Sequence, residues 1–194
     1  QTVQGCLELA LNSVSNEVIK SFSSGRTDSG VHAQGQVMHF DTYADRQSRE
    51  WVRGGNSLLP EDIRILWAKE VKDDFHARFS ALSRSYRYVI RNTEIPSALW
   101  SKRSLWVNTS LKVSCMRKAA KFLIGENDFS SFRGSGCQSH SPIRTLESLK
   151  ITTNNEFIYI DISANSFLLN MVRIIVGTLL LVGKGDILPS DLED

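Results

Sequence analysis

The feature that most constrains the fold of this chain is an apolar stretch, residues 167–182, composed mainly of Leu, Ile, Val, Met and Phe. Asn170 and Arg173 interrupt it, and the sequence has no run of the roughly 18 uncharged apolar residues that a membrane span requires. The chain also opens without a signal peptide. We therefore predict that this stretch is a buried helix of a globular protein.

Two other segments alternate as half-buried strands do. Tyr86, Tyr88 and Ile90 share one face of residues 85–91, and residues 156–164 show the same period of two. Further patterns predict strands at 18–22, 36–40, 63–67 and 143–151, and helices at 3–14, 46–57 and 111–124. Both halves mix helices and strands with antiparallel pairing expected, so the predicted fold class is α+β.

The organisation of the chain suggests two halves, residues 1–95 and 96–194, joined by a linker around Pro96. The sequence opens directly on a helix with Thr2 as its expected N-cap and ends soon after Gly183 and Gly185. We expect a first and a last strand to lie outside it, so that the chain is truncated at both ends. The three cysteines are odd in number and far apart, which fits a reducing compartment and predicts no disulfide and no zinc motif.

Charge is distributed unevenly along the sequence. Residues 76–121 contain ten lysines and arginines and one acid, a net charge of +9, whereas the rest of the chain carries −7. A basic segment of this kind predicts a surface for a polyanion such as nucleic acid. The alternative is a solvated face balanced by acids from elsewhere in the fold.

The first candidate for chemistry is the segment GRTDSG, residues 25–30, between two predicted strands. It presents Asp28 close to Arg26 on a turn, where a carboxylate can serve as nucleophile or base. Asp, Ser and Gly are also ordinary turn residues. From the residues alone, both interpretations stay open.

The second candidate is Arg173, which lies within the apolar stretch. Ser166, Asn170, Arg173 and Gly177 have the spacing of one polar stripe on a helix. A buried cation costs several kcal/mol unless it is paired, and this stretch contains no acid. Asp28 is the partner that we favour, because an Arg contact would keep the carboxylate ionised. A structural ion pair is the alternative.

The third candidate is Tyr86, on a strand whose other face carries Arg87 and Arg91. An aromatic ring among arginines can stack on a base, although a tyrosine in the core has the same pattern. A metal site built from Asp28, His32, His39 and Asp41 is a further alternative.

These motifs match a known family. Residues 25–33, GRTDSGVHA, resemble the signature of TruA-type tRNA pseudouridine synthases, with Ser29 where the family usually has Ala. Further segments follow in the family's order over nearly the whole chain: TVQGCLELAL (2–11), GQVMHFDT (35–42), NSLLPEDI (56–63), FHARFSALSRSYRYVI (75–90), DFSSF (128–132) and NSFLLNMVRIIVGTLL (165–180).

The resemblance implies a pseudouridine synthase fold: two ferredoxin-like halves that share a long, mostly antiparallel sheet with a central cleft. It implies a cytoplasmic homodimer that binds tRNA and isomerises uridine at positions 38 to 40 of the anticodon arm, with no cofactor, metal or membrane. By position, Asp28 is similar to the family's catalytic aspartate and Tyr86 to the tyrosine that stacks on the target base. Arg173 matches the arginine paired with the aspartate, and Arg26 one used in handling the RNA.

Two other functions remain possible from the residues. A non-catalytic RNA-binding module with paired ferredoxin-like halves explains the basic segment and Tyr86, but not a carboxylate in the binding site. A metal-dependent nuclease would use Asp28, His32 and Asp41.

Overall fold

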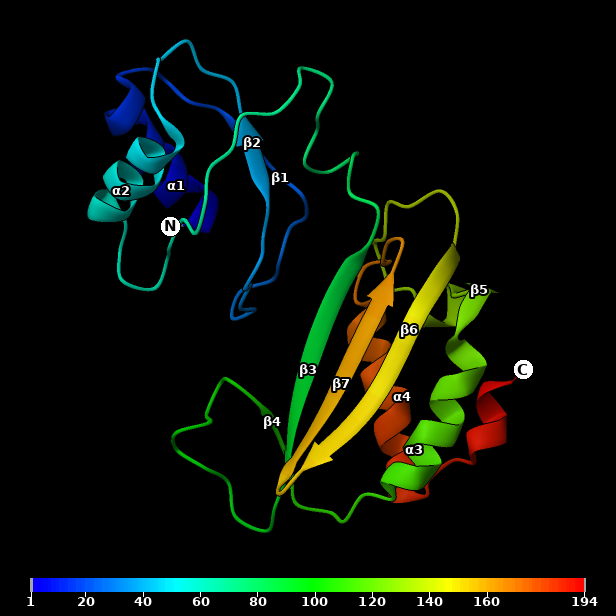
Figure 1. The fold of residues 1–194 in the computed structure, drawn as a ribbon. Coiled ribbons are helices and arrows are strands. Elements are labelled where there is room, and N and C mark those ends of the chain that lie inside the picture. The colour runs from blue at the N-terminus through cyan, green and yellow to red at the C-terminus, as the bar shows by residue number, and fades with distance from the viewer. Residues whose placement is uncertain (1, 194) are drawn as a thin grey trace. The chain divides into compact units, whose positions relative to one another are not determined.

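The computed structural model describes residues 2–193, which divide into two compact units between Ala81 and Leu82 (Figure 1). Helices and strands occur in both units, so the predicted α+β class is confirmed. The sequence pattern places a boundary at residue 95, whereas the strand that contains residues 84–92 belongs to the second unit. None of the helices in the described part of the chain is long and apolar enough to cross a membrane.

The first unit packs two helices beside a small hairpin. Its elements are α1 (Val3–Ser15), β1 (Ser21–Ser23), β2 (Met38–Phe40) and α2 (Ser48–Leu58). As predicted, Thr2 caps α1, because its Oγ1 accepts a hydrogen bond from the Gly5 N–H at 3.1 Å. Leu11 of α1, Ile19 and Trp51 of α2 are buried together, which fixes the two helices against the start of β1.

The second unit is built on one five-stranded sheet, in the order β4-β3-β7-β6-β5. The strands are β3 (Arg84–Asn92), β4 (Leu105–Val107), β5 (Gly125–Asp128), β6 (Ile143–Asn154) and β7 (Phe157–Ala164). All neighbours pair antiparallel except β3 and β4, which pair in parallel over three residues of β3, Ile90–Asn92. The sheet is therefore mixed.

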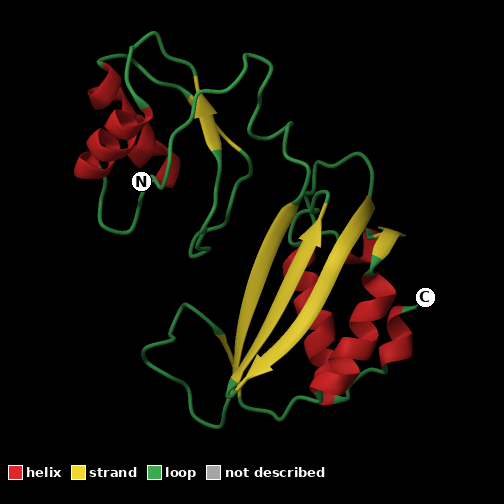
Figure 2. Cartoon of the chain, in the orientation of Figure 1, coloured by secondary structure: helices red, strands yellow, loops and turns green. Residues whose placement is uncertain are grey.

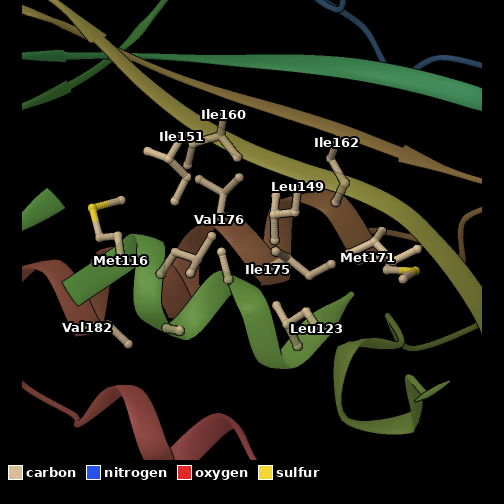
Figure 3. Close-up of a cluster of buried hydrophobic side chains, with 14 of the residues drawn as sticks. Met116, Leu123, Leu149, Ile151, Ile160, Ile162, Met171, Ile175, Val176 and Val182 are labelled. Carbon is tan, nitrogen blue, oxygen red and sulfur yellow. The ribbon is translucent and has the colours of Figure 1, made fainter. Parts of the chain in front are cut away.

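Two helices, α3 (Val113–Ala120) and α4 (Met171–Lys184), cover one face of this sheet (Figure 2). Three short 3₁₀ helices, Lys121–Leu123, Ser130–Phe132 and Pro189–Leu192, complete the unit. The main core lies between the helices and the sheet, where Ile160 of β7 and Ile175 of α4 are fully buried (Figure 3). This core explains the apolar character of α4.

Strand pairing decides which side chains face that core. Tyr86 pairs with Ile162 and Ile90 with Ile158, so the predicted face of β3 lies on the side that the helices cover. Arg87 and Asp161 are paired on the other side of the sheet. The alternation predicted for β3 and β7 is confirmed.

Three predicted elements differ from the structure. Residues 63–67 form no strand, because Asn56 of α2 holds Ile65 in a loop: its amide donates to the Ile65 carbonyl and its Oδ1 accepts from the Ile65 N–H, both at 2.8 Å. β1 begins at Ser21 and not at Val18, which is 93% exposed. The predicted helix 111–124 ends as an α-helix at Ala120 and continues as a 3₁₀ turn.

The fourth difference concerns the apolar stretch itself. Asn170 has left-handed backbone angles, φ 60° and ψ 4°, so α4 begins only at Met171. Asparagine tolerates this conformation better than most residues. Ser166 and Asn170 consequently precede the helix, and the predicted stripe of four small and polar residues along one helix is wrong.

Candidate active-site residues

Asp28 lies in the long loop that connects β1 with β2. The hairpin continues one step beyond its strands, since the Ser24 N–H donates to the Val37 carbonyl at 2.8 Å. Within the loop, the Val31 N–H donates to the Asp28 carbonyl at 3.2 Å, and Gly30 has φ 82°, which a glycine adopts without strain. Residues 28–31 thus form a tight turn that presents Asp28 at the surface, and the role of Asp28 as nucleophile or base stays a prediction.

Arg26 and Asp28 are both exposed in this loop. The base of the loop is fixed by Gln36, whose side chain donates to the Gly25 carbonyl. An exposed loop on a paired scaffold is a common place for reactive side chains. The arrangement leaves Arg26 and Asp28 accessible to a large substrate such as RNA.

Tyr86 is half-buried on the helix-covered side of β3. Its ring meets the ring of Phe167 edge-on, with centroids 5.2 Å apart and an interplanar angle of 76°. Next to it, Arg84 donates to the Asn165 carbonyl at 3.3 Å. The segment that leads into α4 thus contacts the start of β3, and Phe167 fixes the orientation of the tyrosine.

Arg173 lies on the exposed side of α4, together with Gly177 one turn later. The expectation of a buried cation is therefore wrong, because the buried face of α4 is formed by other residues, such as Met171 and Ile175. Burial no longer requires that Arg173 be paired. Since Asp28 belongs to the first unit and Arg173 to the second, their pairing stays a prediction.

The charge asymmetry along the sequence is partly balanced in space. Arg87 forms a bidentate ion pair with Asp161 on the open face of the sheet, at 2.6 and 2.9 Å, and Arg91 pairs with Glu156 in the same way. Both acids lie outside the basic segment 76–121. The hydrogen bonds and charges of these acids raise the pKa of each arginine above its ordinary value.

A metal site finds no support in the described residues. Within residues 2–193, no three His, Cys, Asp or Glu side chains form a group that could hold a metal ion. His39 instead uses its Nδ1 to accept a hydrogen bond from the Ala77 N–H at 3.2 Å. This ring packs among aromatic side chains.

Several residues form contacts in the structure that were not predicted from the sequence. Glu8 of α1 accepts hydrogen bonds from the Ser21 N–H and hydroxyl at 3.0 and 2.8 Å and so fixes the start of β1. One feature of the sequence could have indicated this role: Glu8 is the only charged residue of α1. Cys137 is half-buried, and the backbone N–H groups of Leu169 and Ser139, with Arg133, lower the pKa of its thiol. No sequence pattern indicates that contact.

Comparison with known proteins supports the resemblance. A family model described as tRNA pseudouridine synthase matches residues 1–80 and 119–194. The chain is 48% identical to tRNA pseudouridine synthase A of Nitrosococcus oceani over 100% of its own length and 75% of that protein. It is 48% identical to the protein of the same name from Alcanivorax borkumensis, over 95% of the chain and 69% of that relative, and 51% identical to the one from Glaesserella parasuis, over 95% and 71%. Matches of this extent show that the chain belongs to the TruA family of tRNA pseudouridine synthases, which are isomerases.

Proposed function

We propose that the chain isomerises uridine to pseudouridine in the anticodon arm of tRNA, at positions 38 to 40, with Asp28 as its catalytic residue. The observation that carries the proposal is the position of GRTDSG: the family motif lies on the exposed loop of a hairpin whose base is fixed by Gln36. This loop belongs to a chain that matches the family along most of its length.

The reaction breaks the bond from N1 of uracil to C1′ of the ribose and forms a bond from C5 to C1′. The Asp28 carboxylate can attack C1′, so that uracil leaves with the electron pair of the N1 bond; after the ring turns, C5 attacks C1′ and displaces the carboxylate. Alternatively, Asp28 removes the C2′ proton and returns it after the new bond forms. In both routes C5 loses its proton to solvent, which gives a direct assay.

The other site residues handle the base and the RNA. Uracil must leave its stack before it can react, at a cost of a few kcal/mol. Tyr86, held by Phe167, would stack on the extruded base, and Arg26 on the same loop as Asp28 would contact the RNA backbone. Arg173 would keep the Asp28 carboxylate ionised and oriented. Cations of the basic segment 76–121 would contact phosphates.

The family resemblance also supports further proposals about the whole protein. We propose that its halves are ferredoxin-like, that they share a long sheet with a central cleft, and that the protein acts in the cytoplasm as a homodimer without a metal or cofactor. The mixed five-stranded sheet and its helices provide the α+β framework.

The test compares the protein with its Asp28→Asn variant, which keeps the size of the side chain. Tritium release from tRNA labelled at C5 of uridine should fall at least about 1000-fold, since the reacting group is lost, while tRNA binding changes less than about threefold. Unchanged release by the variant would contradict the proposal. If neither protein releases tritium but both bind tRNA, the RNA-binding module is favoured. Strand cleavage that a chelator abolishes and a divalent ion restores would favour the nuclease.

The second arm of the test is Arg173→Leu. Because Arg173 lies on the exposed side of α4, the variant should fold, and its tritium release should fall about 100-fold through loss of the Asp28 contact. If the contact exists, Arg173→Leu in the Asp28→Asn background should cost little more. Wild-type rates in the single variant would show that Arg173 does not act on Asp28.

A further inference from the structure

Two histidines of the first unit lie against each other and have no part in the chemistry above. His39 of β2 and His76 of the following segment 75–80 have ring centroids 4.5 Å apart. His39 also stacks on Phe22 of β1, its direct partner across the hairpin, with centroids 5.2 Å apart and an interplanar angle of 21°. One imidazole therefore contacts both strands of the hairpin and the segment 75–80.

Both rings accept a hydrogen bond from the backbone of the segment 75–80. The Ala77 N–H donates to Nδ1 of His39 at 3.2 Å, and the Arg78 N–H donates to Nδ1 of His76 at 3.1 Å. Ala77 is only 3% exposed, and a buried N–H needs an acceptor. His39 supplies that acceptor.

His39 is also close in sequence to the loop that carries Asp28. Phe22 and His39 are the middle pair of the short hairpin, and the Ser24 N–H to Val37 carbonyl bond is the last pair before the loop opens. The only cross-strand pair between His39 and that bond is Ser23 with Met38. A change at His39 therefore acts on the base of the catalytic loop.

Loss of the acceptor at position 39 would break this arrangement. The buried Ala77 N–H would lose the hydrogen bond that it makes to Nδ1. The contacts of the ring with Phe22 and Phe75 are aromatic, so a ring without an acceptor can keep them but not the hydrogen bond.

We propose that His39 is a positioning residue for the reaction: its ring accepts the hydrogen bond of the Ala77 N–H, holds segment 75–80 on the base of the β1–β2 hairpin and so keeps the loop that carries Asp28 in place. The proposal rests on the proposed function, because it takes Asp28 as the reacting group. It assigns to His39 no contact with the substrate.

Two substitutions separate the properties of the ring. In His39→Asn, Oδ1 can accept from the Ala77 N–H, but the aromatic contacts of the ring are lost. In His39→Phe, the aromatic contact remains and the acceptor is lost. His76→Asn isolates the second ring, and His140→Asn, at an exposed position in the second unit, is the matched control.

Single-turnover tritium release is measured for the full chain at pH 7.5. His39→Phe should be about tenfold slower than the wild type, because the buried N–H loses its acceptor, whereas His39→Asn should stay within about threefold of the wild-type rate. His76→Asn and His140→Asn should follow the wild type. Wild-type rates in His39→Phe, or a loss in His39→Asn as large as that in His39→Phe, would overturn the proposal.

A second measurement needs no catalysis. The protection factor of the Ala77 amide in hydrogen exchange should fall in His39→Phe, but not in His39→Asn or Asp28→Asn. If Asp28→Asn keeps its activity while Ala77 behaves as expected, the role of Asp28 is wrong and the hydrogen bond of His39 stands. If Ala77 is protected equally in His39→Phe and in the wild type, the proposal for His39 fails whatever Asp28 does.

Discussion

Glu8 illustrates how single residues position the candidate site. The side chain of Gln4, and then the Ser21 N–H and hydroxyl, donate hydrogen bonds that lower the pKa of the Glu8 carboxyl below its ordinary value. Since its folded-state pKa lies below the unfolded value of about 4.3, the carboxylate stabilises the folded protein above that pH. This stabilisation is lost as the pH falls through the folded-state value.

We therefore predict that Glu8→Gln lowers the free energy of unfolding by about 1 kcal/mol at pH 7. The difference from the wild type should shrink as the pH falls through the folded-state pKa of Glu8, because both side chains are then neutral. Urea unfolding of both proteins at a series of pH values from 7 downward measures it. A difference that does not change with pH would show that charge is not involved.

Tyr86 gives a prediction that depends on ring contact. Phe167→Leu removes the edge-on partner of Tyr86 but keeps an apolar side chain, so the tyrosine should lose its fixed orientation. Tritium release should fall about tenfold, and Tyr86→Phe should lose less than Tyr86→Leu, because stacking needs the ring. Rates of Tyr86→Leu equal to the wild type would contradict the stacking role.

At the scale of residues, the sequence indicates a role most clearly where the residues that act together are adjacent in the chain. Arg26 and Asp28 are recognisable because their motif is contiguous and the turn that presents them is set by adjacent residues. The hydrogen bonds of His39 and Glu8 could not be predicted, because their partners, Ala77 and Ser21, come from elsewhere in the chain. The predicted burial of Arg173 was wrong because an apolar composition does not say which side of a helix faces the core.

At the scale of elements, two glycines of the second unit should respond in opposite ways to alanine. A methyl group at Gly134 would lie 2.8 Å from the Leu169 carbonyl oxygen, to which the Gly134 N–H also donates. Gly177 lies within α4, and a methyl group there would meet no other part of the protein within 4 Å.

We predict that Gly134→Ala destabilises the protein by about 1–3 kcal/mol, because backbone must move. Gly177→Ala should stabilise it by up to about 1 kcal/mol through helix propensity. Thermal unfolding of the two variants decides both. A stabilised Gly134→Ala would mean that the loop is not docked against the segment before α4.

Periodic elements were predicted well and their ends were not. The alternation of β3 and β7 and the helical spacing of α1 reflect one buried face each, and burial produces those patterns directly. The ends of α4 and the lost strand at 63–67 depend on single side chains instead. The left-handed backbone of Asn170 makes α4 begin only at Met171. The side chain of Asn56 forms two hydrogen bonds with the backbone of Ile65 and holds it in a loop.

At the scale of the whole molecule, the two units have very different cores. Among residues 2–193, the second unit has one large buried cluster, whereas the first has two small ones, which contain Ala10 and Leu11. We predict that amides of α1 and β1 exchange with solvent faster than those of β7 and α4, because less buried apolar surface opposes their opening. Hydrogen exchange resolved by residue measures this. Equal protection of α1 and β7 would contradict it.

Charge is the whole-molecule property that the sequence described least well. The surface for a polyanion that the basic segment predicts stays a prediction, while Arg87 and Arg91 of this segment are paired with acids of another strand and its turn. Such compensation depends on strand register, which a linear count does not contain.

A shift in the pairing register of β6 has a consequence for how the length of the chain can vary. Leu146 and Leu149 are three positions apart, yet both are buried, because the strand shifts its register between Leu146 and Ser148 and Glu147 is left over. Removing Glu147 would restore simple alternation without turning either leucine outward. We expect natural homologues to differ in length by one residue here more readily than elsewhere in the sheet. A deletion at this position leaves the buried side chains of the strand buried and the exposed ones exposed.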